Sequence, residues 1–138
     1  MIVIRTAEEM ARALDSPLDP EIKQVLQTQR AMLSEYEGYS LEELAEFVIV
    51  QPGDTLAELE AASDMQLVDP EGGQPTFAIG AEWVEQHGTF VTVCFILSDD
   101  GFGVLLFVPT GQGIDPVLQA ACEHELRSRA NLPSAERS

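Results

Sequence analysis

The sequence predicts an α+β domain with a small, mainly antiparallel sheet of three to five strands, packed with about four helices. Two apolar, β-rich runs at 89–97 and 103–109 are joined by a short Asp-Gly loop, which is a strong hairpin signal. Several helix-capping sequences precede segments with helical spacing of apolar residues. Together these observations predict a central hairpin at 89–109 surrounded by helices.

The first forty residues predict one strand and two helices. Residues 1–4 form a short strand, and residues 6–14 begin with a capping box, in which a hydroxyl is followed three residues later by a carboxylate. The second helix begins with Asp19 as the cap and Pro20 at the first helical position, where a missing N–H costs nothing. We expect Gly38 to end it.

The middle of the chain alternates short elements with turns. A capping box predicts a single helical turn at 40–44, a β-branched run predicts a strand at 47–51, and a further capping box predicts a helix at 55–62. The segment 63–79 is rich in Gly, Pro and Asp and is the least regular, with short strands expected near each end. Residues 80–88 predict a short helix that a left-handed Gly88 terminates.

The hairpin loop carries adjacent carboxylates, Asp99 and Asp100, followed by Gly101. Metal and acid–base sites draw carboxylates from several elements, whereas adjacent residues at a loop tip point apart. Asp and Gly are also the residues that a tight turn requires. We therefore assign Asp99, Asp100 and Gly101 to the structure of the turn.

A last helix is expected to begin with Asp115 as the cap and Pro116 at the first helical position. We expect residues 1–130 to form one domain and residues 131–138 to be a frayed tail.

Both alternating sets of side chains in the predicted strands are mainly apolar. A sheet with one wet face would alternate more cleanly, so both faces should be covered. The cover is either helices on each side or a second copy of the chain. A homodimer is therefore expected.

From its composition we expect the chain to be cytoplasmic. The start, MIVIRTAEEM, lacks the long apolar stretch of a signal peptide, and no segment has the apolar length of a membrane span. Cys94 and Cys122 fit small buried hydrophobic residues in a reducing compartment. The single Lys against six Arg, with many Ala, is typical of a GC-rich bacterial genome.

Charge is the unusual property. The chain has 24 acidic and 7 basic residues, a net charge of −17, and residues 31–126 contain 18 Asp and Glu but no Lys or Arg. Direct binding to nucleic-acid phosphates or anionic membranes needs clustered positive charge, so both are disfavoured. A basic protein is the partner that this charge favours.

The best candidate site is the cluster Glu82, Trp83, Glu85 and His87. In a short helix Glu82 and Glu85 share a face, with His87 near its end, and carboxylates with one imidazole can bind a divalent metal or act as an acid–base pair. The simpler interpretation is a solvated helix face beside a core tryptophan. Phosphate-loop, dinucleotide, zinc-protease, CxxC and nucleophile-elbow motifs are missing, and no cofactor is expected.

These observations favour a non-catalytic accessory or regulatory protein that acts through protein–protein contacts. One alternative is an acidic mimic of nucleic acid that inhibits a DNA-binding protein. A second is a small metal-dependent enzyme that uses Glu82, Glu85 and His87. A third is that the acidity serves only solubility, since high net charge keeps proteins apart.

Overall fold

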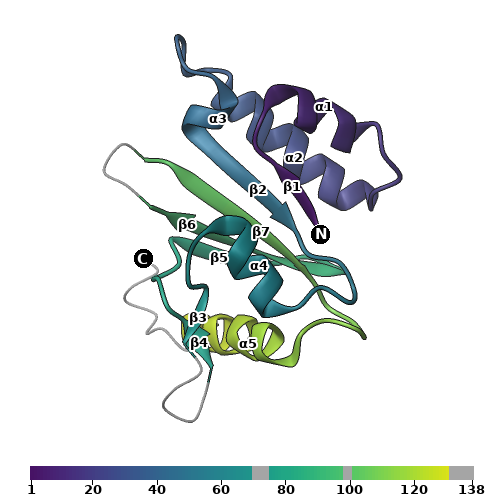
Figure 1. Cartoon of the computed structure of the whole chain (residues 1–138), viewed down its shortest axis with the longest axis vertical. Coiled ribbons are helices and arrows are strands. Elements are labelled where there is room, and N and C mark those ends of the chain that lie inside the picture. Colours follow the sequence, from purple (N-terminus) through teal and green to yellow (C-terminus); the bar gives the residue numbers. More distant parts are fainter. Residues whose placement is uncertain (70–74, 98–100, 131–138) are drawn as a thin grey trace.

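The computed structural model describes residues 1–69, 75–97 and 101–130 and confirms the α+β class (Figure 1). The main sheet has five strands in the order β1-β2-β7-β6-β5. Their bounds are β1 Ile2–Ile4, β2 Ala45–Ile49, β5 Trp83–Gln86, β6 Phe90–Ile96 and β7 Gly103–Pro109. β2 and β7 run parallel, and the three other neighbouring pairs are antiparallel. A second sheet pairs β3 with β4, Val68–Asp69 with Thr76–Phe77.

The helices begin where the capping residues predict. They are α1 Ala7–Leu14, α2 Pro20–Leu33, α3 Leu41–Leu44, α4 Leu56–Ser63 and α5 Pro116–Ala130. Complete capping boxes begin α1, α3 and α4, and Asp19 accepts a hydrogen bond from the N–H of Glu21 at the start of α2. α2 ends at Leu33, before the predicted end at Gly38, whose φ of 85° places it in a later turn.

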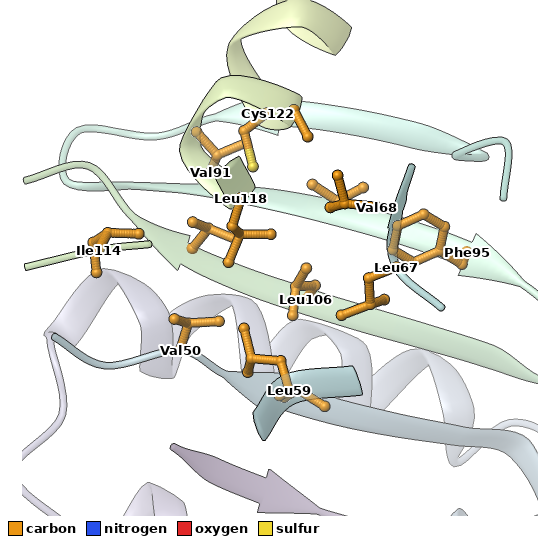
Figure 2. Close-up of a cluster of buried hydrophobic side chains, with 14 residues drawn as sticks. Val50, Leu59, Leu67, Val68, Val91, Phe95, Leu106, Ile114, Leu118 and Cys122 are labelled. Carbon is orange, nitrogen blue, oxygen red and sulfur yellow. The ribbon is translucent and has the colours of Figure 1, made fainter. Parts of the chain in front are cut away.

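One face of the sheet is covered by α4, α5 and the β3–β4 pair (Figure 1). Figure 2 shows Leu118 and Cys122 of α5 above the sheet, with Val68 and Phe95 beside them and Leu59 of α4 nearby. All five side chains are buried. Burying a large apolar side chain stabilises a fold by about 1.5–3 kcal/mol, so this cluster makes α5 part of the core.

The opposite face is covered by α1 and α2, but only in part. Met10 of α1 and Leu26 of α2 are fully buried against side chains of β1, β2 and β7. Farther out, on β6, burial falls along the strand: Phe90 is buried, Cys94 is half-buried and Ile96 is exposed. β5 lies at the edge of the sheet beyond β6. This leaves a strip of β5 and β6 that neither helix covers completely.

The predicted hairpin at 89–109 is confirmed. β6 and β7 pair from Phe90 with Pro109 to Ile96 with Gly103. Gly101 has a φ of 84°, the left-handed conformation for which glycine is the default residue. Asp99 and Asp100 lie outside the described residues.

The predicted helix at 80–88 is wrong, because Trp83–Gln86 forms strand β5 and pairs with β6. Its turn into β6 is closed by a hydrogen bond of 2.8 Å from the N–H of His87 to the carbonyl of Phe90. Gly88 is not among the residues with positive φ, so it is not the left-handed helix end that the sequence predicted. The backbone of this segment instead satisfies its hydrogen bonds by pairing with a long neighbouring strand.

Most of the sheet is covered by elements of its own chain, which removes one reason for expecting a second copy there. The homodimer stays a prediction. Among residues 1–69, 75–97 and 101–130, no helix has the length and apolar character needed to cross a lipid bilayer.

Candidate functional site

A cavity of about 330 Å³ lies between α2 and the incompletely covered strip of β5 and β6. Its sheet side is formed by Trp83, Glu85 and His87 of β5 and the following turn, together with Thr92 of β6. Its helix side is formed by Glu21, Gln24, Val25, Thr28 and Gln29. The structure therefore brings three of the four predicted site residues together, and adds a polar face of α2 that the sequence did not assign to them.

The strand, rather than a helix, places these side chains on one face. Successive residues in a strand point to opposite faces, so positions 83, 85 and 87 share one side. The cross-strand pairs Trp83 with Cys94 and Glu85 with Thr92 put that side against the part of β6 that faces α2. Glu82 precedes β5, is exposed and does not line the cavity. The predicted pairing of Glu82 with Glu85 on a helix face is thus wrong.

His87 is held from three sides. Its ring stacks on Phe90 with centroids 4.4 Å apart and planes inclined by 13°. Nε2 lies 3.2 Å from the hydroxyl oxygen of Thr92, which itself donates to the carbonyl of Glu85 at 3.4 Å. Nδ1 lies 3.7 Å from a carboxylate oxygen of Glu21. These contacts fix the ring against β6 and connect it to α2.

A second cavity, of about 160 Å³, continues from the first and shares Trp83 and Gln29 with it. Its other lining residues are almost all apolar and include Met32 and Leu33 of α2 and Cys94 and Ile96 of β6. We call the two cavities together the helix–sheet groove, with a polar half around His87 and an apolar half around Cys94. From Thr92 to Ile96 the groove follows four strand steps of β6, about 13 Å at roughly 3.3 Å per residue.

Exposed large apolar side chains gather at the apolar end of the groove. In the described part of the chain there are five, between 39% and 61% exposed: Met32, Tyr36, Tyr39, Ile96 and Leu97. We call these five residues the tip patch. They come from the end of α2, its connection to α3 and the end of β6, which lie at the same end of the molecule (Figure 1). A further cavity of about 550 Å³ contains Tyr36 and Tyr39 and shares Leu33 and Leu44 with the apolar half.

Most of the charges around this surface are negative, and the exception is Arg30, which lines a further cavity together with Tyr39 of the tip patch. Glu21 and Glu85 line the polar half, and Glu43 lines the cavity at the tip patch. The two basic residues of α2, Lys23 and Arg30, do not line either half of the groove. The groove therefore offers apolar surface at one end and carboxylates at the other.

The chemistry of the other titratable groups is limited. Burial, and then the charge of Glu82, raises the pKa of the Cys94 thiol above its ordinary value, which disfavours the reactive thiolate. Burial raises the pKa of Cys122 to about 12. Wherever the structure describes the chain, no three His, Cys, Asp or Glu side chains converge closely enough to hold a metal ion.

Sequence reasoning missed Glu21, Gln24 and Thr28, which recur at helical spacing beside the buried stripe of Ile22 and Leu26. That spacing shows that they share a helix face but does not indicate which element the face contacts.

The comparisons with known proteins add nothing to this description: no protein-family model, no curated protein and no solved structure matches the chain.

Proposed function

We propose that this is a non-catalytic accessory or regulatory protein that acts in the cytoplasm by binding a basic protein partner. The observation that carries the proposal is the tip patch: the large exposed apolar side chains that the structure describes lie together at one end. Contiguous apolar surface with a polar rim is typical of protein contact sites, and Tyr is enriched at such sites.

The acidic residues around the tip patch favour a basic partner. Glu35, Glu37, Glu42 and Glu43 lie on or near the connection between α2 and α3, next to Tyr36 and Tyr39, and all four are exposed. Carboxylates around an apolar centre attract a positively charged surface and repel an acidic one. At about 0.1 M salt the Debye length is roughly 10 Å, so this attraction should weaken as salt rises.

The cytoplasmic assignment has a separate support. Cys94 and Cys122 are free thiols, half-buried and buried. Thiols persist in reducing compartments, whereas extracellular domains of this kind are commonly cross-linked by disulfides.

The test compares capture of proteins from a lysate of the native host by three immobilised forms. These are the wild type, the tip variant Tyr36→Ser with Tyr39→Ser, and a control with Ala57→Ser and Ala61→Ser on the exposed side of α4. We expect a basic protein to bind the wild type and the control, and the tip variant to bind it at least tenfold more weakly in titrations of the purified partner. Unchanged affinity of the tip variant for every captured protein contradicts the proposal, as does a partner with an acidic contact surface.

A further inference from the structure

We infer that the helix–sheet groove binds an extended segment of a basic protein, with an apolar side chain in the apolar half and an arginine or lysine in the polar half. This inference rests on the proposed function and specifies the chemistry of the segment that is recognised. It gives Glu21, Trp83 and Glu85 a role in binding cations.

The polar half has the groups that recognise a cationic side chain. Glu21 of α2 and Glu85 of β5 both line the cavity, and both side chains remain accessible to solvent. Trp83 lines both halves, so its ring borders the position between them. Aromatic rings attract guanidinium and ammonium groups at short range, and Trp does so best among the aromatic residues. A planar guanidinium can contact the ring and a carboxylate together, which favours arginine over lysine.

His87 already has contacts within the protein. Its ring is only 14% exposed and both its nitrogens already face protein groups, Thr92 and Glu21. The contact with Glu21 is long, at 3.7 Å, and leaves this carboxylate able to turn toward a ligand.

The groove also limits the spacing within the ligand. On β6 the polar half is lined by Thr92, and the apolar half by Cys94 and Ile96, two and four residues farther along the strand, which is roughly 7 and 13 Å. In an extended peptide, residues i and i+2, or i and i+4, point the same way and are separated by these distances. The recognised segment should therefore place a large apolar residue and a basic residue two or four positions apart.

The first experiment selects binders from a phage-displayed library of random heptapeptides on the immobilised wild-type protein. The selected peptides are then tested on two variants: Thr28→Arg, which places a cation in the groove, and the matched control Gln27→Arg, an adjacent exposed position that does not line it. We expect selected peptides to carry an apolar residue and an Arg or Lys two or four positions apart, and to bind Gln27→Arg but not Thr28→Arg. Peptides without a basic residue, or with equal binding to both variants, overturn the inference.

The second experiment measures the affinity of one selected peptide by isothermal titration calorimetry. We expect Glu21→Gln with Glu85→Gln to weaken binding by roughly tenfold, as two partly exposed ion pairs would. Glu8→Gln with Glu123→Gln removes the same net charge from exposed positions outside the groove and should change affinity less than about twofold. Equal losses in both double variants would mean that only the overall charge attracts the peptide. If binding depends on Tyr36 and Tyr39 but not on the groove residues, the proposed function stands and this inference fails.

Discussion

Asp115 joins the N-termini of two helices that are far apart in the sequence, and its replacement gives a sharp test of the fold. One carboxylate oxygen accepts from the N–H of Val117 at 2.9 Å, at the start of α5. The other accepts from the N–H of Leu56 at 3.0 Å, at the start of α4. Loss of one capping side chain costs about 1 kcal/mol. Asp115→Ala should therefore lower the free energy of unfolding by about 2 kcal/mol, one for each helix.

The chain offers two matched references for this value. Asp115→Asn keeps one oxygen acceptor but puts an NH₂ group toward the second helix, so it should lose about 1 kcal/mol. Thr6→Ala removes the cap of α1 alone, where the hydroxyl accepts from the N–H of Glu9 at 3.1 Å, and should also cost about 1 kcal/mol. Urea unfolding followed by the fluorescence of Trp83 measures all three. If Asp115→Ala costs no more than Thr6→Ala, the shared cap does not stabilise both helices.

Three further predictions follow from local chemistry. Iodoacetamide should label Cys94 slowly and leave Cys122 unlabelled until the protein unfolds, because burial raises the pKa of Cys94 and raises that of Cys122 to about 12. Equal labelling of the two cysteines in mass spectra contradicts this. The backbone N–H of Arg5, and then that of Thr6, donates to the Glu9 carboxylate and lowers its pKa. The stability that Glu9→Gln removes should therefore be present above pH 4.5 and disappear as the pH falls through the lowered pKa, which urea unfolding at several pH values measures. Light scattering should show the predicted homodimer at about 1 M salt, because salt screens the repulsion between two chains of charge −17. At low salt the mass should be near the 15.1 kDa of one chain, and a monomer mass at every salt concentration refutes the dimer.

Local chemistry explains which parts of the fold were predictable. The capping residues fixed the starts of the helices because each cap is a contact within a few residues of sequence. The hairpin at 89–109 was equally local, since two β-branched runs flank a glycine-containing loop. The parallel contact between β2 and β7 carries no such signal, because their pairing depends on the segment of chain between them.

The wrong helix at 80–88 has a physical explanation. The two faces of β5 both carry an apolar residue, since Val84 packs toward α5 and Trp83 borders the groove on the other side. Apolar and polar residues therefore do not alternate in Trp83–Gln86, and the usual sequence signal of a strand is missing. Pairing with β6 overrode local propensity. The short connection was the available signal, since His87, Gly88 and Thr89 alone separate the two strands and such short connections are typical of a hairpin.

The candidate site was predictable only from its β5 side. Trp83, Glu85 and His87 were selected by residue type, but the strand rather than a helix brings them together. Glu21 lies far from them in the sequence and reaches His87 only through the packing of α2 on the sheet. A single sequence does not specify such a contact, because many helix faces present similar polar residues.

The most direct test of partner binding in the groove is a titration followed by two-dimensional ¹H–¹⁵N spectra. The chain has one tryptophan, so one indole N–H signal reports on Trp83. When a basic peptide selected on the wild type is added, we expect that signal to shift in a saturable way, together with backbone amides of Pro20–Leu33 and Phe90–Ile96 around the groove. Saturable shifts confined to α4 and α5, with the indole signal unchanged, would contradict the assignment of the binding site.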